Sequence, residues 1–245
     1  MTIAAPAPTR TRAARPGSSG QVEVIAHGSP DPRHRQSVSR LCTQLTALTG
    51  LPARAAYLEH DHPAATDVLS VPAPPNTPTL VIPLLLTAGF HWHSDIPPVV
   101  AHAGCRSVLL APPEPLLFRS AVAELVGAAG HVVLASAGSS RPEIVTRFAA
   151  LADALGTPQR TVDVCLTPAA VADTATPQST VVPFLTADGL FADRVRRAAH
   201  AARASVTPVL GDTDGFAQTL ADLVMAHSLS LSLTLDDGAT SRGSA

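Results

Sequence analysis

Short apolar runs alternate with longer amphipathic segments along most of this chain. The run QVEVIAH at 21–27 is typical of a strand, and the stretch 34–50 follows with the apolar spacing of one helical face and ends at Gly50. That face consists of Val38, Leu41, Cys42, Leu45 and Leu48. Further strands are predicted at 54–59, 79–86 and 106–112, and further helices near 63–71, 95–104 and 115–129. Such alternation predicts a parallel sheet with helices on both faces.

The same order of segments occurs twice. HVVLASAGSSRPE at 131–143 is similar to QVEVIAHGSPDPR at 21–33, and TVVPFLTADGLFADRV at 180–195 is similar to LVIPLLLTAGFHWHSDI at 80–96. A third pair joins RTVDVCLTPAA at 160–170 to RAAYLEHDHPAA at 54–65. The copies lie 100 to 110 residues apart. Two copies, each a full α/β unit, indicate an internal duplication and not a solenoid.

The duplication predicts the domain organisation. We expect an N-terminal α/β half over 21–130 and a C-terminal half over 131–235 that is a degenerate repeat. Each half is expected to be flavodoxin-like, with a parallel sheet flanked by helices, and the active site is expected in the cleft between the halves. Residues 1–20 lack the apolar core of a secretory signal and are expected to be a disordered leader, and 236–245 a flexible tail.

Composition narrows the class of protein. A content of 46% hydrophobic and 15% charged residues is that of a soluble globular protein. All 17 basic residues are arginine, and the net charge of -2 gives no support for a nucleic-acid partner. No apolar stretch is long enough for a membrane span. Cys42, Cys105 and Cys165 are far apart, which argues against a disulfide framework or a cysteine metal site and fits a cytoplasmic location.

Three polar residues stand where predicted strands of the first half end. They are His27, Glu59 and His91. In open α/β sheets, ligands bind outside the carboxyl ends of the strands. Two imidazoles and a carboxylate there suit Fe(II), Co(II), Ni(II) or Zn(II), and they could also transfer protons near neutral pH. The simpler alternative is that each is an ordinary hydrogen-bonded or solvated residue, as we expect for His60, His62 and His93.

The second half lacks these groups. Aligning the copies places Ala137 opposite His27, Cys165 opposite Glu59 and Phe191 opposite His91. Residues needed only for folding would tend to persist in both copies. The pattern therefore favours a first half that holds the chemistry and a second half that has become scaffold.

Three segments carry a family resemblance. AHGSPDPR, YLEHDHPA and IPLLLTAGFHWHSDIP resemble, in this order, the signature segments of the sirohydrochlorin chelatase family, the CbiX and SirB type of class II chelatase. The resemblance covers roughly residues 21–235. Two features depart from it: Pro30 stands where the family often has arginine, and the His-rich tail of some cobalt-inserting relatives is absent.

The resemblance implies a function and a set of site residues. It implies insertion of Fe2+ for siroheme, or of Co2+ for cobalamin, into sirohydrochlorin, with no organic cofactor. His27 and His91 would bind the metal or pass it to the ring, and Glu59 would complete the metal shell or accept a pyrrole proton. Residues expected to bind the substrate are Ser29, Arg33, Arg35, Gly89, Trp92 and Arg141, of which the arginines would meet its carboxylates.

Several alternatives stay open at this point. The substrate could be another macrocycle or Ni2+, the protein could carry a metal or tetrapyrrole without catalysis, or the histidines could be incidental to a structural domain. A chain with both halves is expected to be a monomer, with a weak homodimer as the alternative. Asp95 is expected to cap the following helix, or else to orient His91 or His93.

Overall fold

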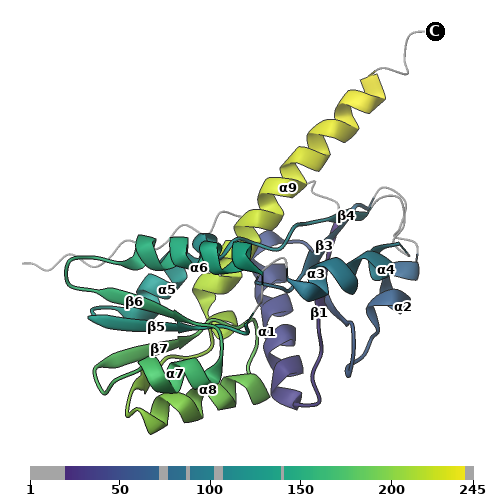
Figure 1. The fold of residues 1–245 in the computed structure, drawn as a ribbon. Helices are drawn as coiled ribbons and strands as arrows, with labels where there is room; N and C mark the ends of the chain where they lie inside the picture. The colour runs from purple at the N-terminus through teal and green to yellow at the C-terminus, as the bar shows by residue number, and fades with distance from the viewer. Residues whose placement is uncertain (1–19, 72–76, 87–88, 102–106, 139–140, 241–245) are drawn as a thin grey trace, which may run out of the picture.

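Two lobes, each built on a four-stranded parallel sheet, form the molecule in a computed structural model that describes residues 20–71, 77–86, 89–101, 107–138 and 141–240 (Figure 1). The first sheet has the strand order β2-β1-β3-β4 and the second β6-β5-β7-β8. The strands of the first are β1 (Gln21–Ala26), β2 (Ala53–Tyr57), β3 (Thr79–Pro83) and β4 (Ser107–Leu109). Those of the second are β5 (His131–Ala135), β6 (Thr161–Cys165), β7 (Ser179–Pro183) and β8 (Ser205–Val206).

The helices connect these strands and cover both faces of each sheet. In the first half they are α1 (Pro32–Thr49), α2 (Ala65–Ser70), α3 (Phe90–Ser94), α4 (Ile96–Val100), the 3-10 helix η1 (Pro115–Phe118) and α5 (Arg119–Val126). In the second half they are α6 (Pro142–Leu155), α7 (Pro168–Thr174), α8 (Leu190–Ala201), the 3-10 helix η2 (Leu210–Asp212) and α9 (Asp214–Thr240). The predicted α/β class with two similar parallel-sheet units is confirmed.

The ladder registers refine the internal alignment. Ile25 pairs with Pro83 in the first sheet and Ala135 with Pro183 in the second, so these positions are equivalent. The same strands place Ile25 beside Ala56 and Ala135 beside Cys165. The counterpart of Cys165 is therefore Ala56, and the predicted pairing of Cys165 with Glu59 was wrong by three positions. Both segments contain Pro-Ala-Ala, but Pro63 lies seven residues after Ala56 and Pro168 only three after Cys165, so the difference in loop length misleads the alignment.

Helix α1 forms where its apolar stripe predicts it. The side chain of Asp31 accepts a hydrogen bond from the amide of Arg33 (3.0 Å) at the N-terminus, and Pro32 occupies the first turn, where a missing amide costs nothing. Gly50 ends the helix in the left-handed conformation (φ 73°). The two ends therefore have the residues that a helix start and stop require.

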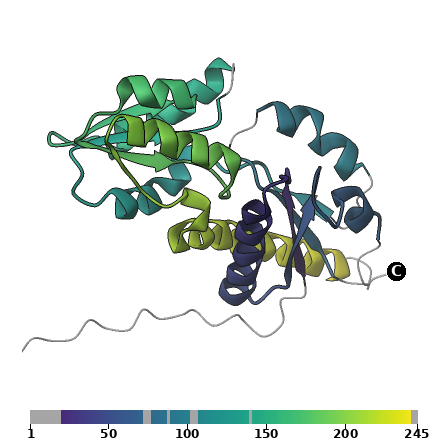
Figure 2. The same ribbon diagram turned by 90° about the horizontal axis from the view of Figure 1, so that it is seen from below.

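One hydrophobic core joins the two halves. Its buried residues come from β1 and β3, from β5 and β7, and from helices on either side of the chain midpoint. Helix α5 precedes the second sheet in sequence yet packs on β7 and α6, while α9 leaves the second half and packs along α1 (Figures 1 and 2). The halves thus exchange helices across the boundary predicted at residue 130.

Some elements differ in length from the prediction. Strand β3 ends at Pro83, and the helix expected at 95–104 is replaced by α3 and α4, which meet at Asp95 with prolines in the first turn of α4. Helix α9 continues to Thr240, past the predicted start of the tail at 236. The predicted leader, apart from Gly20, and Cys105 lie outside the described residues.

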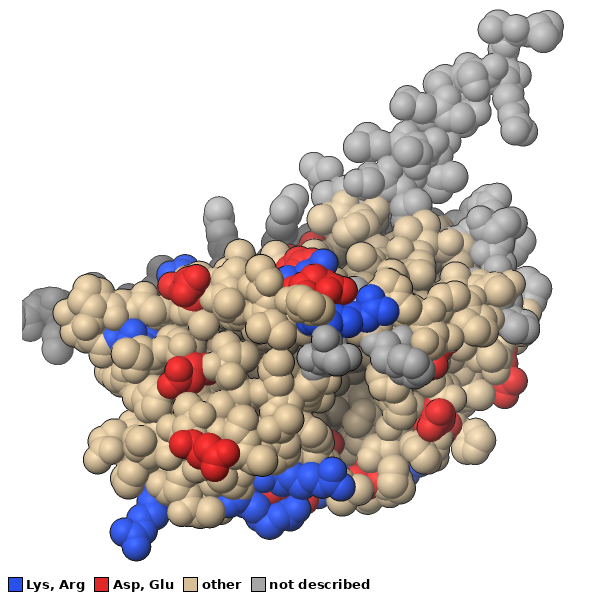
Figure 3. Space-filling model, in the orientation of Figure 1, with Lys and Arg blue, Asp and Glu red and all other residues tan. Residues whose placement is uncertain are grey.

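The cysteines, the surface charges and the helix lengths match what the composition predicts. Cys42 and Cys165 are buried free thiols. On the face seen in Figure 3, acidic and basic side chains are interspersed, and neither sign forms a continuous field. Among the helices of the described residues, none has the length and apolar character needed to span a membrane.

Candidate functional site

Two imidazoles meet at the carboxyl edge of the first sheet. His27 directly follows β1, and His91 lies in α3, which follows the neighbouring strand β3. Their ring centroids are 4.5 Å apart in an edge-to-face arrangement. The expected convergence of these two residues is thus observed, although His91 is held by a short helix and not by the strand end. At this separation one divalent ion could contact both rings.

Hydrogen bonds determine which nitrogen of each ring carries the proton. Nδ1 of His27 lies 3.1 Å from the carbonyl oxygen of Gly28, and Nδ1 of His91 lies 2.5 Å from Oδ2 of Asp95. Both partners can only accept, so in the neutral rings Nδ1 carries the hydrogen and the lone pair is on Nε2. This is the tautomer that binds a metal through Nε2, with an oxygen acceptor behind the ring.

Glu59 lies on the same edge, but its carboxylate contacts His60 and does not form a three-ligand group with the two imidazoles. Its amide donates to the carbonyl oxygen of His27 (2.8 Å), which joins the exits of β1 and β2. Its side chain is 62% exposed and contacts Nε2 of His60 at 3.5 Å. Within the described residues, no group of three or more His, Cys, Asp or Glu side chains is arranged to hold a metal ion. The structure therefore assembles two of the three predicted ligands.

Gly28 makes the close approach of β1 and β2 possible. It has φ 93°, and a Cβ atom added there would lie 1.7 Å from the carbonyl oxygen of Glu59. Both observations require a residue without a side chain. The His-Gly-Ser turn thus places His27 beside the exit of β2.

Two residues near the pair had no signal in the sequence. Asp61, 7% exposed, accepts a hydrogen bond from the amide of Ser29 (3.3 Å) and pairs with Arg35 at 3.5 Å. Nδ1 of His34 is buried without a hydrogen-bond partner. Burial lowers the pKa of His34, His27 lowers it further, and Asp61 and Asp31 oppose the change. Only the fold shows that the first turn of α1 faces the exits of β1 and β2.

Arg33, a predicted substrate anchor, contacts carboxylates of the protein itself. Its guanidinium pairs with Asp31 (2.6 Å) and, across the two halves, with Asp193 of α8 (2.6 Å). Arg196 also binds Asp193 (3.0 Å). We call these four residues the clasp. In this structure the clasp ties the turn before α1 to the start of α8.

The other predicted substrate residues are spread over both halves. Arg35 is exposed beside Asp61, and Arg141 lies before α6 in the second half and pairs with Glu143 (3.4 Å). Trp92 packs on the outer face of the first sheet in the cluster that contains Ile25 and Ile96. The hydroxyl of Ser29 accepts from the amide of Asp31 (3.1 Å), and Gly89 immediately precedes α3. Their roles stay predictions.

Comparison with known proteins finds a family model that matches most of the first half. Residues 21–113, which contain His27, Glu59 and His91, match the family model CbiX. We call this matching segment the CbiX unit. A search of curated proteins returns no match. The CbiX unit thus includes both imidazoles and the strands that hold them.

Solved structures share most of the architecture. The sirohydrochlorin chelatase SirB from Bacillus subtilis subspecies spizizenii, in complex with cobalt, aligns with a TM-score of 0.68 and 21% identity over 82% of this chain and 92% of its own. CbiX, described as the terminal enzyme for biosynthesis of siroheme in denitrifying bacteria, aligns with a TM-score of 0.63 and 20% identity. The alignment covers 84% of this chain and 98% of the CbiX chain. A multi-domain protein of Deinococcus radiodurans, described as structurally similar to chelatases, aligns at 0.61 over 83% of this chain and 54% of its own. These likenesses extend the fold beyond the CbiX unit.

Proposed function

We propose that this protein is a sirohydrochlorin chelatase that inserts a divalent metal ion into the tetrapyrrole. The observation that carries the proposal is the pair of imidazoles, His27 and His91, which lie 4.5 Å apart at the carboxyl edge of a CbiX unit with both Nδ1 atoms directed at oxygen acceptors. Such a pair can hold a metal ion through two Nε2 lone pairs and leave its other coordination positions to water and to the ring nitrogens.

The reaction needs two events that this edge of the sheet can support. The metal must lose bound water, and two pyrrole N–H protons must leave the macrocycle as the ring nitrogens bind. His27 and His91 would hold the ion in place during ligand exchange. Glu59, whose carboxylate is solvent-exposed on the same edge, would take a pyrrole proton to solvent after a side-chain rotation, and a base so placed contributes about 100-fold or more.

Fe2+ and Co2+ are the proposed metal substrates, with Ni2+ as a further candidate. Neutral imidazoles are borderline ligands that bind all three ions, so the donor set does not rank them. The cobalt ion belongs to the SirB structure and shows what that protein accepts. No organic cofactor is needed for the proposed chemistry, because the ring supplies the nitrogen ligands.

The test is an anaerobic absorbance assay of sirohydrochlorin with Fe2+, Co2+ or Ni2+ in turn. We expect the wild-type protein to accelerate the spectral change above the rate without enzyme. His27→Ala and His91→Ala are each expected to lower kcat/KM by roughly 100-fold, because each leaves one imidazole on the metal. His200→Ala, which removes an exposed histidine from α8 in the second half, serves as the matched control and should retain full activity.

Two outcomes would count against the proposal. Binding of the tetrapyrrole or the metal without acceleration by wild type would mean a carrier and not a catalyst. Full activity of both histidine variants would mean that the imidazole pair is incidental.

A further inference from the structure

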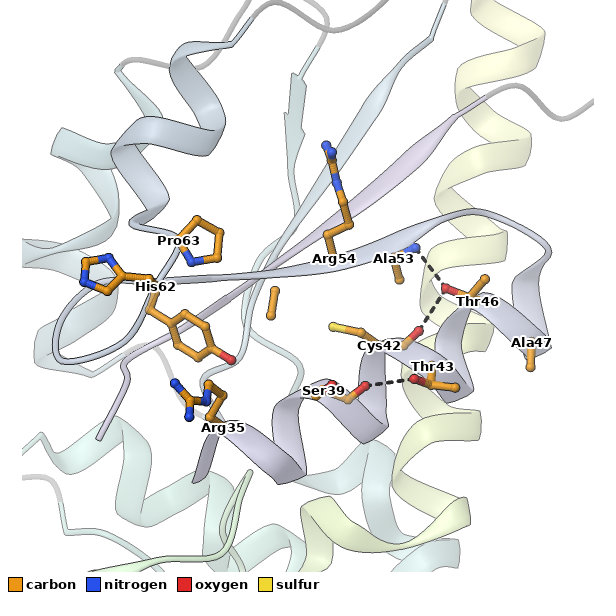
Figure 4. A pocket seen from close by; sticks show the side chains of 12 residues that line it. Arg35, Ser39, Cys42, Thr43, Thr46, Ala47, Ala53, Arg54, His62 and Pro63 are labelled. Carbon is orange, nitrogen blue, oxygen red and sulfur yellow. Dashed lines mark hydrogen bonds between the residues drawn. The ribbon is translucent and has the colours of Figure 1, made fainter. Parts of the chain in front are cut away.

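A groove runs along the open edge of the first sheet, between α1 and β2 (Figure 4). It has a volume of about 750 Å³ and is widely open to solvent. Arg35, Ser39, Cys42 and Ala47 line it from α1, and Ala55 and Tyr57 from β2. Neither His27 nor His91 lines the groove. It therefore lies apart from the imidazole pair, although it is lined by Arg35, which was expected to meet carboxylates of the tetrapyrrole.

Strand β2 presents unpaired backbone to this groove. It is the edge strand of its sheet, and the ladder to β1 uses the carbonyl of Pro52 and the amide of Leu58. In a parallel ladder alternate residues bond to the same neighbour, so Ala53, Ala55 and Tyr57 direct their backbone groups outward. Thr46 accepts from the amide of Ala53 (3.0 Å), and Pro63 accepts from that of Tyr57 (3.0 Å). The outward amide of Ala55 has no such acceptor within the described part of the chain.

The phenol of Tyr57 is a second donor on the groove. Tyr57 is only 2% exposed and lines the groove, and its hydroxyl makes no hydrogen bond with any residue that the structure describes. The hydroxyl is not among the buried atoms that lack a partner, so it reaches the solvent in the groove. Burial, with smaller contributions from Asp61 and Cys42, raises the pKa of Tyr57 to about 12, while Arg35 opposes this. The hydroxyl therefore remains a donor at neutral pH.

The charges around the groove favour an anion. Its lining has no Asp or Glu, and burial raises the pKa of the Cys42 thiol to about 12, so that wall is neutral. Arg35 is 58% exposed, and its 3.5 Å contact with Asp61 leaves guanidinium donors for a second acceptor. Arg54 adds no charge inside, because its side chain points away from Cys42 and Thr46 and binds Glu23 (Figure 4).

We propose that the groove between α1 and β2 binds a small organic carboxylate. The carboxylate accepts from the guanidinium of Arg35 and the hydroxyl of Tyr57, and the apolar body lies over Cys42, Ala47 and Ala55. The amide of Ala55 provides a further donor along the strand edge. A carboxylate can accept from Arg35 and Tyr57 at once, which neither a cation nor a hydrocarbon can do.

Tyr57 makes the test direct, because it is the one tyrosine in the chain. Protein labelled with 13C at the tyrosine ζ-carbon gives a single NMR resonance, which is followed during titration with benzoate at constant ionic strength. We expect a saturable shift in the millimolar range. Benzamide, the neutral isostere, is expected to bind at least 10-fold more weakly. The same titration of His27→Ala should be unchanged, so the result does not depend on the chelatase reaction.

Three variants separate this groove from general surface binding. Arg35→Ala should weaken benzoate at least 10-fold, and Ala47→Phe, which fills the groove from an exposed helical position, should abolish the shift. Arg147→Ala is the matched control, because Arg147 is also a helical arginine in a surface ion pair (2.8 Å to Glu114), and it should bind as wild type does. Absence of any shift, equal binding of benzamide, or wild-type affinity in Arg35→Ala would overturn the proposal.

Discussion

The carboxylate of Asp95 lies 2.5 Å from Nδ1 of His91, and at the residue scale this contact determines how the imidazole is presented. The two residues are four apart along α3 and the start of α4, so one turn of backbone sets their separation. Asp95 precedes α4 but makes no side-chain capping bond there. The capping role expected of it is therefore not seen, and its carboxylate is committed to His91.

We expect Asp95→Ala to lower kcat/KM for metal insertion by roughly 10- to 100-fold, because a ligand histidine without its oxygen acceptor loses its fixed orientation and tautomer. Asp95→Asn should keep more of the activity, since its amide oxygen can still accept from Nδ1. The measurement is the sirohydrochlorin assay, together with the Kd for Co2+ from calorimetry.

Thermal unfolding of both Asp95 variants provides the control. If both variants melt at the wild-type temperature, any loss of activity results from a change in the site and not from loss of stability. Equal activity of Asp95→Ala and wild type would show that the contact with His91 has no positioning role.

At the element scale, the apolar periodicity was sufficient to locate β1, α1 and most other elements, and the repeat was sufficient to establish the duplicated α/β class. The ends of strands were less predictable, because the run after Pro83 is as apolar as β3 itself. The exchange of α5 and α9 could not be predicted, since periodicity shows that a helix has a buried face but not which sheet covers it.

The candidate site was predictable only in part for a similar reason. His27 and His91 follow neighbouring strands, and topology brings such residues together. The direction of the Glu59 side chain and the proximity of His34 and Asp61 depend on loop conformation, which no local pattern specifies. Arg33 was expected to bind substrate, but the sequence could not show that Asp193 lies within reach.

The exchanged helix α9 predicts that the two halves unfold together. Phe216 of α9 is buried and stacks on Phe118 of η1 at a centroid distance of 4.8 Å, inside the core that both sheets share. We expect Phe216→Ala to lower the free energy of unfolding by about 3–5 kcal/mol. Trp92, the single tryptophan, lies in the first half and reports on it by fluorescence. In Phe216→Ala, the midpoint of urea unfolding should therefore fall by the same amount whether it is followed by circular dichroism or by tryptophan fluorescence.

Leu190→Ala supplies the comparison for Phe216→Ala, because Leu190 is an exposed apolar residue at the start of α8. It should change the free energy of unfolding by less than about 1 kcal/mol. A tryptophan transition that stays in place while the circular dichroism transition moves would show that the halves unfold independently.

At the scale of the whole molecule, the halves are joined by a core on one side and by the clasp at their carboxyl edges. Arg33 belongs to the first half, while Asp193 and Arg196 belong to α8. A further contact joins the amide of Asp188 to the hydroxyl of Ser37 (3.2 Å), and Gly189 lies against Asp31. The clasp therefore holds the turn that follows His27 against the second half.

The clasp predicts a dependence of stability on pH. Hydrogen bonding by Arg33, with a smaller contribution from Arg196, lowers the pKa of Asp193 to about 2, against an ordinary value near 3.8 in the unfolded chain. A carboxyl whose pKa is lower in the folded state stabilises that state when ionised. The contribution of Asp193 should be complete above about pH 5 and should disappear as the pH falls through 4 towards 2.

The measurement is urea unfolding of wild type and Asp193→Asn from pH 2 to pH 6. We expect wild type to be the more stable protein at pH 6 and the two midpoints to converge near pH 2, because protonated Asp193 no longer attracts Arg33. Asp222→Asn, which alters an exposed aspartate of α9 that bonds only within its own helix (3.0 Å to Gln218), should show no such convergence. If the urea midpoints of wild type and Asp193→Asn differ by as much at pH 2 as at pH 6, then packing at this position, and not charge, joins the halves.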